Sequence, residues 1–371
     1  MTFMAFLRPP SLAATFIRRA LPAISLLLCA GCASVAPDAG YLWQSVRGHL
    51  SLMNAAQPVE QWLSNPDTSA DLRQRLELAQ RIRRFASAEL ALPDNDSYHR
   101  YADLKRSAAV WNVVAAPRYS LTPRTWCFPI AGCVGYRGYF DLAQAQAFAD
   151  GLRAQGLDVS VYGVPAYSTL GYLNWAGGDP LLNTFIRYPE GELARIIIHE
   201  LAHQKVYAAG DTEFNESFAT SVERIGGARW LSEHASAAAQ REYAAFDQRR
   251  QQFRALVRDV RDKLAALYAE QHDPDALAAG KARILADLRM RYQAVKNSWD
   301  GDAKRYAGYD DWIARANNGS FVAFTAYDEL VPDFEALFTR EGRDWRRFYA
   351  AVGKLATMPR EQRRAALKNM G

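Results

Sequence analysis

Apolar residues recur at helical spacing near the start of the chain. Over residues 40–63 and 69–90 they fall on one side of a helix, with charged and polar residues on the other, which predicts two amphipathic helices. The dipeptide Asn65-Pro66 separates the two, because proline does not continue a helix. Ser69 is a residue typical of a helix start, so we place the beginning of the second helix there.

The same period dominates the C-terminal part of the chain. Residues 237–271 and 276–299 keep it with only the breaker "HDPD" between them, which predicts a long antiparallel helical hairpin. Two more helices are expected between residues 317 and 359, with breaks around Pro332 and at "EGRD".

A different pattern occupies residues 110–190, where short runs rich in Val, Tyr and Phe are bounded by Pro and Gly. Such runs are typical of strands, and a helix that stops at Gly156 lies among them. We expect strands within 107–121, 137–141, 157–173 and 183–188, and helices over 142–156 and 191–210. These elements predict a predominantly helical α+β fold, with a small mixed sheet next to a buried helix and the long hairpin towards the C-terminus.

Composition and charge narrow the class of protein. The 371 residues are 49% hydrophobic and include 17 Phe, 18 Tyr and 9 Trp, which indicates a globular protein. The net charge is +5, but Arg8, Arg18 and Arg19 lie in the first 31 residues, which contain no acidic residue. The remainder is nearly balanced, so we predict no nucleic-acid partner.

The first 31 residues have the pattern of an export signal. A basic flank ending in "RRA" precedes the short apolar run "LPAISLLLCAG", which is too short for a permanent membrane anchor. The ending "LCAGC" resembles a bacterial lipobox, in which Cys32 would be lipidated, although Cys29 stands where an aliphatic residue is usual. Ala33 favours the outer membrane by the same resemblance. We therefore predict a lipid-anchored envelope protein facing the periplasm, with cleavage and plain secretion as the alternative.

Two cysteines remain in the mature chain. Cys127 and Cys133 bracket "CFPIAGC", a tight loop with Pro and Gly, and a disulfide across it suits an exported protein. The alternative is half of a metal knuckle, which the lack of a nearby histidine disfavours.

Candidate chemistry lies in "HELAH". His199 and His203 are four residues apart on the predicted helix 191–210, so both rings project from one face and can bind one Zn²⁺. Glu200 lies next to that face, where it can hold a water molecule and accept its proton.

A third ligand can come from a second helix that starts near Asp211 or Thr212. Glu216 falls early in it, and an antiparallel return would bring this carboxylate back to the two rings. Glu223 lies seven positions further on the same face and could accept a ring N–H from a ligand histidine. Thr220 is the alternative for that role, and a solvated Glu223 is the plain interpretation.

The segment "HELAHQ" followed by "FNESFATSVE" resembles the gluzincin metallopeptidases, especially the aminopeptidase N branch, where "HELAHQ" and "NEGFASFVE" flank the site. The linker here is shorter, which suggests a compact relative. The resemblance covers residues 192–226 and implies that His199, His203 and Glu216 are zinc ligands and that Glu200 is the general base and acid. With "CFPIAGCVGYRGYF" and the lipobox, the chain is also similar, over nearly all its mature length, to a family of bacterial aminopeptidases predicted to be exported.

Peptide hydrolysis also needs a donor for the oxyanion and a strand on which to lay the substrate. We expect the donor to be Tyr327, with Tyr172 as the alternative, and the strand to lie within residues 161–173, where Pro165 suits a sheet edge. No acidic residue for the substrate amine can be assigned from the sequence.

We therefore predict a zinc metallopeptidase that acts on peptides, as an aminopeptidase or alternatively an endopeptidase. From another class, an envelope lipoprotein could keep zinc for structure and present residues 231–297 to a protein partner. The expected organisation is a signal peptide at 1–31, a metallopeptidase core at 32–230, and a helical region at 231–371 packed on the core.

Overall fold

A computed structural model describes residues 40–128, 132–166, 177–299, 306–325 and 329–370. The chain divides into two compact units, residues 1–50 and 51–371, and the candidate site lies in the second. The division at residue 230 that we predicted stays a prediction.

The N-terminal helices differ from the expectation in one place. The predicted helix 40–63 is interrupted: residues 40–55 are helical, β1 (Gln57–Pro58) follows, and α2 spans Val59–Ser64. The interruption lies at Pro58, which lacks an N–H and disfavours helical geometry in the residue before it. The second helix, α3 (Ala70–Ala88), begins as predicted, with Ser69 Oγ accepting a hydrogen bond from the Leu72 N–H.

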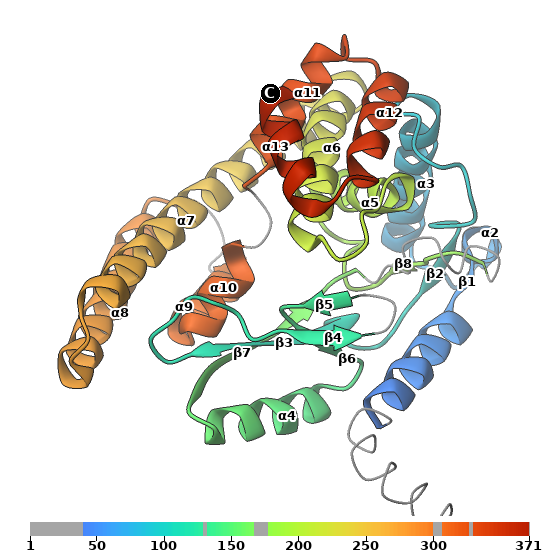
Figure 1. The fold of residues 1–371 in the computed structure, drawn as a ribbon. Coiled ribbons are helices and arrows are strands. Elements are labelled where there is room, and N and C mark those ends of the chain that lie inside the picture. The colour runs from blue at the N-terminus through green and yellow to red at the C-terminus, as the bar shows by residue number, and fades with distance from the viewer. Residues whose placement is uncertain (1–39, 129–131, 167–176, 300–305, 326–328, 371) are drawn as a thin grey trace, which may run out of the picture. The chain divides into compact units, whose positions relative to one another are not determined.

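Within the described residues the strands form three small sheets (Figure 1). The first is mixed, since β2 (Arg100–Ala102) pairs antiparallel with β1 and parallel with β8 (Leu181–Leu182). The second is antiparallel, in the order β6 (Arg137–Tyr139), β3 (Val110–Pro117) and β7 (Leu157–Val164). The third is the hairpin of β4 (Trp126–Phe128) and β5 (Gly132–Val134).

The predicted crossover helix is confirmed, and one predicted strand is wrong. Helix α4 (Leu142–Ala154) connects β6 to β7, and Gly156 follows it with φ +81°, a left-handed conformation that glycine adopts easily. Residues 183–188, predicted as a strand, form turns in which the Ile186 N–H bonds to the Leu182 carbonyl. Phe185 and Ile186 are buried in a turn, and burial alone does not distinguish a turn from a strand.

Helices α5 (Glu190–Lys205) and α6 (Thr212–Glu233) run through the main hydrophobic core. We predicted that the first would continue to Gly210, but it ends at Lys205 and Val206 is extended. The next residues form the turn that leads into α6.

The predicted hairpin is confirmed as α7 (Ala237–Glu270) and α8 (Pro274–Asn297), which lie side by side (Figure 1). A second hydrophobic cluster forms between the hairpin, α9 (Ala307–Ala314) and α10 (Asn318–Thr325).

Three helices, α11 (Val331–Arg340), α12 (Trp345–Ala356) and α13 (Arg360–Met370), complete the chain. Pro332, which we expected at a helix break, lies in the first turn of α11, where its missing N–H costs no hydrogen bond. None of the helices in the described ranges combines the length and apolar character that a bilayer span requires.

Candidate metal centre

The turn between α5 and α6 is held by side chains of α6. Asp211 caps the helix by accepting from the Phe214 N–H, and the buried Asn215 side chain bonds both the N–H and the carbonyl of Ala208. The Arg363 guanidinium of α13 donates to Asp211 across 2.7 Å in a pair that is almost fully buried. These contacts turn the chain back so that α6 lies antiparallel to α5.

Two consecutive glycines let the helices approach closely. A Cβ at Gly227 would lie 2.9 Å from the Arg195 Cγ, and one at Gly226 would lie 2.5 Å from Leu90 Cδ1 and 3.4 Å from Ile198. Any larger residue would therefore push α6 away from its neighbours.

This arrangement brings the three predicted ligands together. His199 Nε2 and His203 Nε2 are 3.1 Å apart, and Glu216 Oε2 lies 3.3 Å from the first and 3.6 Å from the second. The two rings are nearly perpendicular, at 86°. His203 is buried, and the other two are half-buried.

These separations can be compared with those of a zinc site. Ligand atoms about 2.0–2.1 Å from a tetrahedral zinc ion lie roughly 3.3–3.4 Å from one another. The observed 3.1, 3.3 and 3.6 Å are close to the edges of such a tetrahedron. Two imidazoles and a carboxylate are also the donor types that zinc prefers, so the residues present fit the ion.

A buried ion-pair network lies behind His199. Its Nδ1 is 3.0 Å from Glu223 Oε2, which is within hydrogen-bonding distance. Glu223 Oε1 is paired with Arg195, which lies one turn before His199 on α5. Arg195 also contacts Glu192 at 3.2 Å. Glu223 thus lies beside His199 Nδ1, where we had expected either Glu223 or Thr220 to accept the ring N–H.

The electrostatics of the cluster favour a cation. Burial lowers the pKa of the His199 ring, but hydrogen bonds to Glu216 and Glu223 outweigh burial and raise that pKa well above its usual range. Burial raises the pKa of the Glu216 carboxyl, yet the neighbouring His203 and His199 rings lower it well below its ordinary value. Burial also raises the pKa of Glu223, and Arg195 and His199 reverse this and hold it at about 2. Both carboxylates are therefore anionic at neutral pH.

The Glu200 side chain is half-buried and makes no hydrogen bond or ion pair with any described residue. A carboxylate in this state can bind a water molecule. Tyr98 is buried, and burial raises its pKa, with the Glu200 charge as a further cause.

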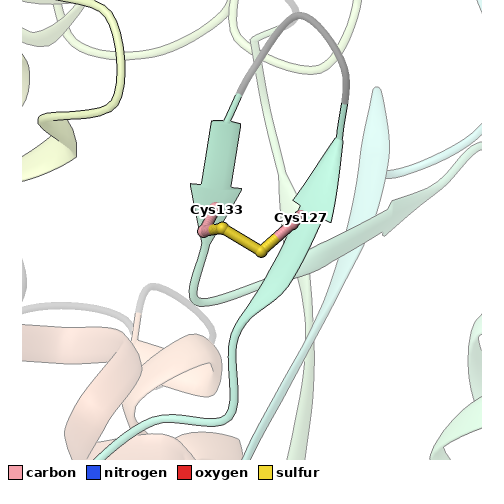
Figure 2. The surroundings of a disulfide bond; sticks show 2 residues. All are labelled: Cys127 and Cys133. Carbon is pink, nitrogen blue, oxygen red and sulfur yellow. A yellow bond between two sulfur atoms is a disulfide. The ribbon is translucent and has the colours of Figure 1, made fainter.

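Five other predicted residues can be placed or set aside. Cys127 and Cys133 form a disulfide that joins β4 to β5 (Figure 2). Tyr327, Tyr172 and Cys32 lie outside the described residues.

A second group with metal-binding donors consists of Glu89, Glu233 and His234. The Arg229 guanidinium pairs with both carboxylates, at 2.6 and 3.0 Å, and so already supplies the positive charge. We therefore place the candidate metal centre on α5 and α6 only.

Two residues of the centre were missed by sequence reasoning. Arg195 interrupts the apolar run before His199, and a charged residue in a buried helix signals a buried partner. Asn215 precedes Glu216 directly, but its role depends on the turn, which the sequence does not show.

No curated protein and no solved structure matches the chain. Residues 40–367 match the model of a family described as "Putative aminopeptidase", which includes every residue of the centre and excludes only the ends of the chain. The chain therefore belongs to this aminopeptidase family, whose name denotes peptide hydrolysis.

Proposed function

We propose that the protein is a zinc-dependent peptidase that removes residues from the N-terminus of peptides. The observation that carries this proposal is the meeting of His199, His203 and Glu216 at separations suited to one tetrahedral ion. The family supports the reaction class, and the donor set supports zinc.

The residues of the centre have distinct roles in this proposal. Bound zinc would lower the pKa of a water molecule and polarise the scissile carbonyl. Glu200 removes a proton from the attacking water and delivers it to the leaving amine. Glu223 accepts the His199 Nδ1–H, which leaves the Nε2 lone pair for the ligand position.

Substrate positioning can use β7, which is an edge strand of its sheet. On the side of β7 that faces away from β3, the Asn317 amide donates a hydrogen bond to the Val159 carbonyl. From there to the end of the strand at Val164, no described strand pairs with this side of β7. An extended peptide could add there through main-chain hydrogen bonds. Tyr327 or Tyr172 remains our proposal for the oxyanion donor.

We also propose export and attachment to the outer membrane through lipid on Cys32, facing the periplasm. The disulfide supports an oxidising compartment, because such bonds persist mainly outside the cytosol. Cys32→Ser should abolish incorporation of a labelled fatty acid and release the protein from the membrane fraction.

The variant Glu200→Gln tests the catalytic proposal. We expect it to keep wild-type zinc content and to lose turnover by about 10²–10⁴-fold, because the general base is removed. Glu335→Gln, on the exposed face of α11, is the matched control and should keep full activity. Products from a peptide library, read by mass spectrometry, separate N-terminal from internal cleavage.

The metal assignment has its own test. His203→Ala should lose the zinc that co-purifies with the wild type, whereas the exposed His272→Ala should retain it. A zinc-loaded wild type without turnover on any library peptide would instead support a structural zinc in a binding protein. A wild type without affinity for zinc would refute the proposal.

A further inference from the structure

A cavity of about 1020 Å³ lies beside α5, on the side where Arg195 holds Glu223. It opens between α6 and α7, and its size is at the upper end of small-molecule sites, which are about 300–1,000 Å³. Among the described residues that line it, Asp247 is the one carboxylate and five are arginines: Arg195, Arg224, Arg250, Arg254 and Arg258.

The arginines are distributed along the cavity. Arg250, Arg254 and Arg258 are spaced four residues apart on α7, so they share one helix face and span about 12 Å. Arg224 faces them from α6. A ligand that contacts this row must carry negative charge at more than one point.

The two inner arginines are engaged within the protein. Arg250 contacts Glu192 at 2.8 Å and also pairs with Asp247, and Arg195 pairs with Glu192 and Glu223. They form the charged floor of the cavity.

Two other arginines of the cavity, Arg224 and Arg258, remain open to a ligand. Arg224 is 42% exposed and lies 3.7 Å from its carboxylate partner Glu335. Arg258 is exposed and has no ion-pair partner among the described residues.

Positive charge is therefore in excess. Five arginines face the four carboxylates of Asp247, Glu192, Glu223 and Glu335. Burial raises the pKa of Glu192 to about 7, despite the nearby Arg195. At neutral pH this carboxyl group therefore carries only part of a negative charge.

We propose that this cavity binds a phosphorylated organic compound with at least two anionic groups. A planar guanidinium donates two parallel hydrogen bonds to a phosphate, which makes arginine well suited to this recognition. Leu231, Ala228 and Ala255 provide an apolar wall for the carbon part of the ligand. The proposal does not depend on the peptidase proposal, because binding requires no turnover and the variants that test it change neither a candidate metal ligand nor Arg195.

Calorimetric titration of the purified protein with pyrophosphate at low salt tests it. We expect binding that weakens as salt is added, and weaker binding of inorganic phosphate, which carries a single phosphoryl group and less negative charge. The double variant Arg224→Gln/Arg258→Gln should lower the affinity for pyrophosphate by about tenfold or more, since two charge-assisted contacts are lost. Both side chains are exposed, so the fold should be unchanged.

The matched control is Arg289→Gln, which removes the same charge from an exposed position of α8 outside the cavity. An equal loss of affinity in this control, or no binding of pyrophosphate up to about 1 mM, would overturn the proposal. Sedimentation with phosphatidylglycerol vesicles distinguishes the two sources of the phosphate: binding to vesicles identifies a lipid headgroup, and binding to pyrophosphate alone identifies a soluble compound.

Discussion

The substitution Glu223→Gln isolates the support that lies behind the candidate metal ligands. In the structure one oxygen of Glu223 is 3.0 Å from His199 Nδ1, and the other is paired with Arg195. A glutamine is nearly the same size, but it has only one acceptor oxygen and its amide group is itself a donor. After the substitution, either the His199 N–H or the Arg195 guanidinium loses its acceptor.

The substitution should change two quantities, the affinity for zinc and the free energy of unfolding. Loss of the partner that orients a ligand histidine lowers metal affinity by about 10–100-fold. Breaking a buried ion pair costs up to about 3–5 kcal/mol. Here Arg195 keeps Glu192 at 3.2 Å, and the amide oxygen still accepts one bond, so we expect the zinc-free protein to lose about 1–3 kcal/mol of unfolding free energy.

Zinc affinity can be measured by competition with a chelating dye, and stability by urea unfolding of the zinc-free protein. Glu335→Gln is the control: its side chain is 42% exposed and 3.7 Å from Arg224, so it should change stability by less than about 1 kcal/mol and leave zinc affinity unchanged. If Glu223→Gln bound zinc within twofold of the wild type while folding normally, Glu223 would not orient His199 and our interpretation of the network would be wrong.

Four further predictions concern stability, each measured by urea unfolding. Replacing Cys127 and Cys133 together by serine should lower the unfolding free energy by about 2 kcal/mol, the loop-closure entropy of so short a loop; an unchanged value would show that the bond adds nothing. Gly227→Ala should cost about 1–3 kcal/mol, because its methyl group would lie 2.9 Å from a packed side chain. Gly151→Ala, in an exposed helix turn with no atom within 4 Å, should instead stabilise by up to about 1 kcal/mol. Burial raises the pKa of Glu192 from 4.5 to about 7, so the folded state binds more protons and stability should fall by up to about 3 kcal/mol between pH 5 and pH 8. Glu192→Gln should lack this part of the fall.

The sequence was most informative where a pattern repeats over many residues. The hairpin follows from a helical period sustained over two long segments with a clear breaker between them. The spacing of His199 and His203 likewise gives their common direction from helix geometry alone. Local rules were sufficient for these features.

Features that depend on distant contacts could not be predicted. The end of α5 at Lys205 depends on the turn that Asn215 holds, and the Arg195–Glu223 pair joins residues 28 positions apart. Phe185 and Ile186 are buried in turns, and a short apolar run of this kind also occurs in buried strands. In each case tertiary packing decides between local alternatives that the sequence leaves equal.

The contact between Arg363 and Asp211 has a practical consequence for handling the protein. Through this contact α13 holds the start of α6, although the two residues are 152 positions apart in the chain. Proteolytic clipping in the short link at residues 357–359 would loosen that attachment while leaving every candidate ligand in the remaining fragment. Preparations that have lost α13 would still contain His199, His203 and Glu216. We expect them to be inactive, because the start of α6 is no longer held in place.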